Sequence, residues 1–176
     1  IFKNVKSEIK DGTEPKLKEI DIFVEEMPTG EISLAAGVGS SGSTIGGGIQ
    51  EKNFLGKGIN LSTDLELSNS SIKGSFLYSQ PNFAYTDNTL DTRFTSTTTD
   101  NLSDFGYKVS ELGLSLGTSF ERYENLFIKP SISVNLEDLE TNSSASTNLK
   151  KQEGKYSDFY LNYGLSYDQT NSKFLP

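Results

Sequence analysis

The chain contains neither cysteine nor histidine among its 176 residues. Without cysteine it has no disulfides, no thiolate zinc ligands and no thiol nucleophile. Without histidine, the Ser–His and Cys–His pairs that activate many nucleophiles are excluded as well. These absences remove the commonest nucleophilic pairs and zinc ligands, and we expect no catalytic residue, no metal site and no bound cofactor.

Apolar residues are also scarce. They make up 34% of the chain, which argues against a large dry core. No run approaches the roughly 18–20 apolar residues that a membrane helix needs. The formal net charge of −8 disfavours nucleic acid as a partner, because phosphate binding needs stripes of Lys and Arg.

What the sequence does contain is alternation. In the segments 59–67 and 112–120, apolar residues alternate with polar or tiny ones. A period of two indicates a β-strand with one apolar face. That face looks into the core of a soluble sandwich or out at lipid from a membrane barrel. Small residues opposite bulky aliphatic ones favour the barrel.

The same alternation predicts an all-β fold, an antiparallel meander of about eight strands. Their approximate ranges are 30–40, 43–53, 57–68, 71–80, 88–99, 107–121, 126–139 and 156–169. The connections Thr97–Tyr107 and Leu139–Tyr156 are long and polar. The turns on the opposite side carry aromatic residues typical of a membrane-interface girdle, namely Phe54, Phe83, Tyr85, Phe120, Tyr123 and Phe127.

Residues 1–28 have a different composition and predict a charged β-hairpin that turns at Lys10–Pro15. We interpret it as the end of a small separate domain. Pro28, Thr29 and Gly30 are the predicted hinge, because proline ends a ladder and glycine frees the backbone. The chain opens on Ile1 without an initiator Met and stops abruptly at Pro176, so we expect an internal fragment of a longer protein.

Two local patterns allow a functional and a structural interpretation. Gly37–Gly42 matches G-x-G-x-x-G, but the glycine-rich segment 43–49 cannot supply the helix that a dinucleotide site requires. These glycines predict either curvature of a barrel wall or a weakly paired first strand whose edge can receive another chain. Glu137, Asp138 and Glu140 could bind calcium on a loop, although a solvated acidic loop is the simpler interpretation.

Several segments resemble the junction between the POTRA domains and the barrel in the BamA family, the outer-membrane β-barrel assembly factors. They are the junction Val24–Glu31, the turn Asn53-Phe54-Leu55-Gly56-Lys57-Gly58, the turn Ser79–Phe83 and the start Phe2–Val5. The resemblance implies that residues 1–28 end a periplasmic POTRA domain. It also implies that residues 29–176 form the first half of a sixteen-stranded barrel in the bacterial outer membrane.

The resemblance further implies a non-enzymatic function. Unfolded outer-membrane protein clients would pair with the backbone of the first barrel strand, and accessory assembly lipoproteins and the lipid bilayer would be the other partners. The implied site residues are the pairing edge (Glu31, Ile32, Ser33, Leu34, Ala35, Ala36, Gly37, Val38 and Gly39), the turn motif (Asn53, Phe54, Leu55, Gly56 and Gly58) and the hinge (Pro28, Thr29 and Gly30).

Other classes of protein fit the same pattern. A TamA-like or two-partner secretion pore would share the POTRA–barrel plan, and an ordinary porin or a small soluble β-domain would share the alternation. Five upstream POTRA repeats in the full-length protein would favour the assembly factor, fewer would favour the pore, and none would exclude both.

Overall fold

The computed structural model describes residues 2–12, 17–39 and 42–169. Within these ranges, ten strands and two short helical segments form. The strands are β1 (Phe2–Asp11), β2 (Lys18–Glu26), β3 (Gly30–Gly39), β4 (Gly42–Phe54), β5 (Ile59–Ser68), β6 (Ser71–Gln80), β7 (Thr89–Asn101), β8 (Tyr107–Tyr123), β9 (Leu126–Thr141) and β10 (Gly154–Tyr167). The helical segments are η1 (Phe83–Tyr85) and α1 (Thr147–Lys150). No helix in the described ranges is long and apolar enough to cross a membrane.

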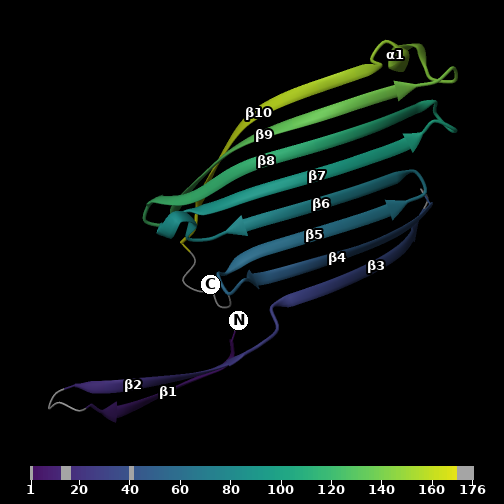
Figure 1. Ribbon diagram of the computed structural model, residues 1–176. Helices are drawn as coiled ribbons and strands as arrows, with labels where there is room; N and C mark the ends of the chain where they lie inside the picture. The colour runs from purple at the N-terminus through teal and green to yellow at the C-terminus, as the bar shows by residue number, and fades with distance from the viewer. Residues whose placement is uncertain (1, 13–16, 40–41, 170–176) are drawn as a thin grey trace.

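The strands form two sheets. β1 and β2 pair as a hairpin, and β3 to β10 form an eight-stranded sheet in which each strand pairs antiparallel with the next along the chain. The hairpin projects away from the end of the larger sheet at which β3 begins (Figure 1). The predicted all-β meander and its preceding hairpin are therefore confirmed. The predicted turn at Lys10–Pro15 begins too early, because Lys10 and Asp11 belong to β1 and pair with Glu19 and Lys18. Its residues 13–15 lie outside the described residues.

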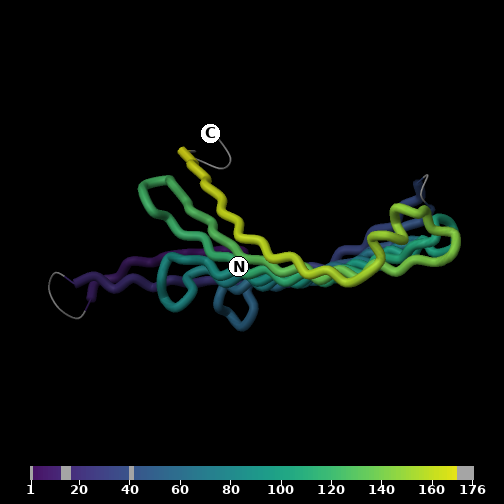
Figure 2. The backbone as a smooth tube through the Cα atoms, turned by 90° about the horizontal axis from the view of Figure 1, so that it is seen from above, coloured from purple at the N-terminus to yellow at the C-terminus, as the bar shows by residue number. Residues whose placement is uncertain are grey.

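The eight-stranded sheet is a single curved layer (Figure 2). Among the described residues only three apolar side chains are buried, and each of them keeps 6–7% of its surface exposed: Ile59, Leu139 and Ala145. A layer of this kind has two open faces and no interior. The low apolar content of the sequence agrees with this arrangement.

Register sorts the side chains onto these two faces. One row across β6 to β10 is apolar, whereas the next row, one residue along each strand, is small or polar and points to the opposite face. The apolar row is Phe76, Phe94, Leu114, Val134 and Phe159; the polar row is Ser75, Thr95, Gly113, Asn135 and Asp158. We call the first the outer face and the second the inner face. Phe120 continues the outer face, whereas Phe127 lies on the inner face opposite Ser166.

The two connections expected to be long are shorter than predicted. β7 runs to Asn101 and β9 to Thr141, which leaves only residues 102–106 and 142–153 outside the strands. The polar segment 97–101 pairs with residues 107–111. Backbone hydrogen bonds need no apolar side chains, so the ladder continues beyond the apolar part of each strand.

These two connections pack against each other. The Asn142 side-chain amide donates to the Leu102 carbonyl at 2.8 Å, and the Asn142 backbone N–H donates to the Gly106 carbonyl at 2.9 Å. Gly106 has a left-handed backbone with φ 76°. A Cβ at this position would overlap the backbone nitrogen of Ala145. The contact therefore requires glycine both for its conformation and for its lack of a side chain.

We expect Gly106→Ala to destabilise the folded full-length protein by about 3 kcal/mol, combining roughly 1–2 kcal/mol for a left-handed residue with at least 1 kcal/mol for overpacking. Gly56→Ala is the matched control, because Gly56 has φ 70° but no atom within 4 Å of its Cβ position. It should cost about 1–2 kcal/mol. Denaturant titration in detergent micelles measures both, and equal losses would contradict the packing argument.

Candidate functional site at the edge strand

The predicted pairing edge, Glu31–Gly39, lies entirely within β3. β3 ends the order of the larger sheet and pairs only with β4 among the described residues. Its other side presents a row of backbone N–H and C=O groups, and such a row is a template for another strand. β10 forms the opposite edge of the same sheet (Figure 1).

The two faces of β3 differ strongly. Ile32, Leu34 and Val38 extend from the outer face and are 75–88% exposed. Ser33, Ala35 and Gly37 lie on the inner face in register with residues of β4. A strand presented in this way offers apolar side chains on one face, almost no side chains on the other, and an open backbone edge.

The glycines of β3 do not make room for a neighbouring group. A Cβ at Gly37 or Gly39 would meet nothing within 4 Å, and neither residue has a left-handed backbone. In a strand interior such glycines remove side-chain contacts and increase the entropy of the unpaired chain. The G-x-G-x-x-G pattern that includes them ends at Gly42, the first residue of strand β4, so a strand rather than a helix follows it, as expected. Residues 40–41 of the pattern lie outside the described ranges.

Contacts at the predicted hinge join the start of β3 to the end of β4. The Thr29 carbonyl accepts from the Lys52 N–H at 3.2 Å, and the Thr29 hydroxyl bonds to the Glu51 carboxylate. Gly30 is the first residue of β3, is not left-handed and pairs with Glu51. The segment outside the strands is therefore 27–29.

An exposed ion pair supports the same junction. Lys52 Nζ lies 3.3 Å from Glu31 Oε2, and a solvent-exposed pair of this kind contributes little stability by itself. Sequence reasoning missed Glu51 and Lys52. The available signal was their charge, since they are the first charged residues along β4 and lie close to its end at Phe54.

The predicted turn motif is held together by hydrogen bonds to Asn53. Asn53 Oδ1 accepts from the Gly58 N–H at 2.8 Å, and the Asn53 carbonyl accepts from the Gly56 N–H at 2.9 Å. Leu55, Gly56 and Gly58 have φ values of 58°, 70° and 66°, which explains both glycines. Asn53 and Phe54 belong to β4, so the turn begins two residues later than expected.

The acidic residues considered for calcium do not lie on a loop. Glu137, Asp138 and Glu140 belong to β9, where Glu137 points to the face opposite Asp138 and Glu140. Asp138 instead forms an ion pair with Lys155 at 3.2 Å. Within the described ranges, no group of three or more acidic residues could hold a metal ion.

The fold and its faces define a class of protein. An antiparallel meander in one curved layer, apolar on one face and small or polar on the other, is the wall of a transmembrane β-barrel. The Omp85 superfamily domain matches residues 53–176. The chain belongs to this superfamily.

A crystal structure of BamA from Haemophilus ducreyi, lacking POTRA domains 1–3, has the same fold. The match has a TM-score of 0.74 and 23% sequence identity, and it covers 99% of this chain and 37% of that one. The chain thus spans little more than a third of that structure and matches part of its barrel. No curated protein matches the chain in sequence.

We expect Asn53→Ala to lower the free energy of unfolding by about 1 kcal/mol, because the Gly58 N–H loses its acceptor. Asn88→Ala is the control: Asn88 also lies beside a turn at this end of the sheet, and only its backbone takes part in hydrogen bonds. The control should change stability by less than about 0.5 kcal/mol. Denaturant titration of the full-length protein measures both, and equal losses would contradict this role of Asn53.

Proposed function

We propose that the protein is a bacterial outer-membrane assembly factor that inserts and folds β-barrel proteins by pairing their strands with β3. No covalent bond is made or broken in this process. Membership of the Omp85 superfamily supports a general function in barrel assembly or protein translocation. The observation that carries the finer proposal is the open edge of β3.

The features of β3 suit the pairing of an incoming strand. Its backbone groups would bond to a client strand by β-augmentation, which requires no particular client sequence. Its inner-face residues would not obstruct that strand, since Ser33, Ala35 and Gly37 have small or absent side chains. Its outer side chains would remain in lipid, where the client's own apolar face must also lie.

In this proposal the outer face contacts the bilayer and the inner face lines the barrel lumen. The turn at Asn53–Gly58 and the hinge at residues 28–30 would lie on the periplasmic side. Residues 1–28 would complete a periplasmic POTRA domain, and residues 29–176 would form the first half of the barrel. The hairpin supports this division, because Val5, Ile9, Ile20, Ile22 and Val24 are exposed and an isolated two-stranded hairpin is marginally stable in water.

If the outer face contacts lipid, arginine substitutions at two adjacent residues should differ in their effect on stability. Leu114 points from the outer face and Ser115 from the inner face. We expect Leu114→Arg to destabilise the protein by about 2–4 kcal/mol, the cost of a cation near the bilayer midplane, and Ser115→Arg to cost clearly less. Unfolding titrations of the full-length protein in lipid vesicles measure both free energies. Equal costs would contradict the assignment of the faces.

A disulfide across the seam tests the function itself. Ser33→Cys or Gly37→Cys, each combined with a cysteine on the last strand of the barrel, should block insertion of a radiolabelled client into vesicles when oxidised. Reduction should restore insertion. The control is a disulfide within the wall between Ser115→Cys and Ser133→Cys, whose positions are directly opposite on β8 and β9.

The control disulfide should leave client insertion unchanged. If the oxidised seam variants inserted clients at the normal rate, pairing at β3 would be excluded as the mechanism. A normal insertion rate together with a loss of client export would favour the related translocation or secretion pore instead.

A further inference from the structure

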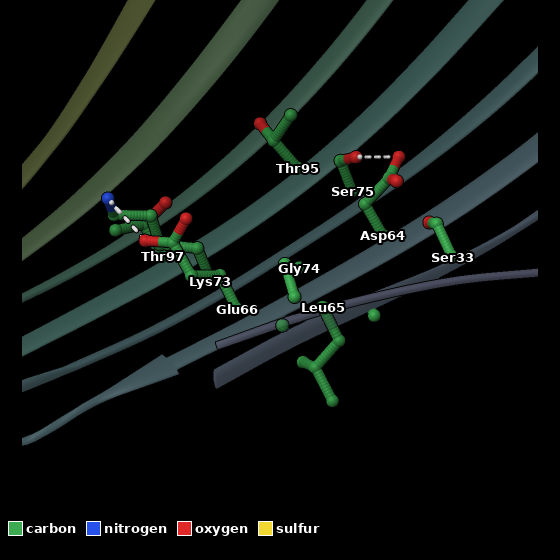
Figure 3. Close-up of a pocket in the computed structure, with 12 residues that line it drawn as sticks. Ser33, Asp64, Leu65, Glu66, Lys73, Gly74, Ser75, Thr95 and Thr97 are labelled. Carbon is green, nitrogen blue, oxygen red and sulfur yellow. Dashed lines mark hydrogen bonds and ion pairs between the residues drawn. The ribbon is translucent and has the colours of Figure 1, made fainter. Parts of the chain in front are cut away.

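Polar side chains in the middle of the inner face bond to one another. Ser75 Oγ donates to Asp64 Oδ2 at 3.3 Å, and Lys73 Nζ lies 3.1 Å from Glu66 Oε1 (Figure 3). Such bonds satisfy polar groups within the protein itself. These four side chains therefore have partners within the wall, whereas a second group of polar side chains, on the outer face, does not.

The outer face of β7 to β10 changes in character toward the end of the sheet at which α1 lies (Figure 1). The apolar row that contains Leu114 is followed by a mixed row and then by a polar row, each two residues further along the strands. The mixed row is Ser96, Leu112, Leu136 and Ser157; the polar row is Thr98, Ser110, Asp138 and Lys155. The apolar part of this face therefore ends at the mixed row.

The length of the apolar part puts this change at the edge of the hydrocarbon layer. On β8 the outer-face residues from Leu112 to Phe120 are apolar apart from Thr118, and they span about 27 Å at roughly 3.4 Å per residue. With the tilt of about 40° usual in outer-membrane barrels, their height is about 20 Å, close to the roughly 25 Å of the apolar band. Ser110 and Asp138 then lie at the level of the lipid headgroups.

Four hydroxyl side chains line one depression at this level: Ser96, Thr98, Ser110 and Ser157. Leu112 and Leu136 line its apolar side. None of the four hydroxyls forms a hydrogen bond with another group in the part of the chain that the structure describes. A hydroxyl at the edge of the hydrocarbon layer needs a polar partner, and here that partner has to be a lipid headgroup or interfacial water.

A cation beside the depression favours the headgroup. Lys155 also lines the depression, and its side chain is 83% exposed although Nζ lies 3.2 Å from Asp138 Oδ2. An ammonium group has three donors, so one ion pair leaves Lys155 able to bond to a further acceptor. An ammonium group and several hydroxyls together are suitable donors for the oxygens of a phosphate.

We propose that this depression binds a lipid of the surrounding bilayer through the phosphate of its headgroup. Lys155 and the four hydroxyls donate to the phosphate oxygens, and an acyl chain follows the apolar outer face of β8 and β9 from Leu112 and Leu136 onward. The occupant is a lipid rather than free phosphate, because the donors and the apolar surface are continuous on one face. The proposal rests on the assignment of that face to the bilayer in the proposed function, and it does not involve β3.

Photo-crosslinking of the full-length protein in micelles of a nonionic detergent tests the site. The probe is phosphatidylglycerol with a diazirine near the ester end of one acyl chain, and peptide mass spectrometry locates the adduct. We expect attachment close to Leu112 and Leu136. Diacylglycerol with the same diazirine but no phosphate should attach about tenfold less at these positions, since it lacks the charged acceptor. Equal attachment of the two probes would show acyl-chain contact alone and would overturn the proposal.

Lys155→Gln should lower the yield of the phosphatidylglycerol adduct about fivefold, the usual effect of one cation at an anionic membrane surface. Lys151→Gln is the matched control, because Lys151 follows α1 at the same end of the sheet and does not line the depression. The control should leave the yield unchanged. Equal losses for the two variants would indicate a general effect of surface charge, and either this result or a normal yield for Lys155→Gln would overturn the proposal.

The hydroxyls can be removed without changing the charge of the site. Ser96→Ala, Ser110→Ala and Ser157→Ala combined should lower the yield about tenfold, because several hydrogen bonds to a charged group are lost. The control removes three hydroxyls from the inner face of β8 and β9, by Ser115→Ala, Ser131→Ala and Ser133→Ala. It should leave the yield unchanged. A similar loss in both triple variants, or no loss in the first, would contradict the role of the outer hydroxyls.

Two further results separate this proposal from its alternatives. Millimolar inorganic phosphate should not lower the adduct yield, and if it did, the site would bind free phosphate rather than a lipid. Equal costs of Leu114→Arg and Ser115→Arg would remove the lipid-facing assignment and this proposal with it. Unequal costs without phosphate-dependent attachment would contradict this proposal alone, whereas normal insertion by the oxidised seam variants would contradict pairing at β3 and leave the lipid site unaffected.

Discussion

A single β-sheet cannot bury its own apolar face, and this constraint determines the rest of the structure. The outer-face row from Phe76 to Phe159 has no second layer among the described residues to pack against. Lipid can cover that face, and the family to which the chain belongs is consistent with such a neighbour. In lipid every backbone group must be paired within the protein. The meander meets this requirement for its internal strands, so the unpaired backbone is confined to the two edges.

Much of this architecture could be predicted from the alternation of side chains alone. Segments such as 112–120 have a strict period of two, and the register places their apolar residues on one face. The strand ends could not be predicted in the same way. Residues 97–101 read as a polar loop, yet they continue the ladder with residues 107–111. The alternation of apolar and polar residues indicates which part of a strand lies in an apolar environment. Backbone pairing continues beyond that part, where the strand is in water.

The candidate site at β3 could be predicted from the sequence. Which of the nearby glycines have a close neighbour at their Cβ position could not. Gly37 and Gly39 have open space at their Cβ positions, whereas Gly48 lies beneath Asp64 and Ser33. The difference depends on which residues are cross-strand neighbours, and register is a property of the whole sheet rather than of the local sequence. The role of Glu51 at the junction was hidden for the same reason, because its partner Thr29 lies 22 positions earlier in the chain.

The two groups of glycines have opposite effects on the edge strand. In β3 they remove side-chain contacts without making room for another group. The side chains of β3 therefore contribute little to its pairing with β4. In β4 the glycines leave space that neighbouring side chains occupy, Leu34 at Gly47 and Asp64 with Ser33 at Gly48. In its middle, β3 therefore faces no side chain directly opposite on β4, and its other edge is a row of backbone groups without a described partner.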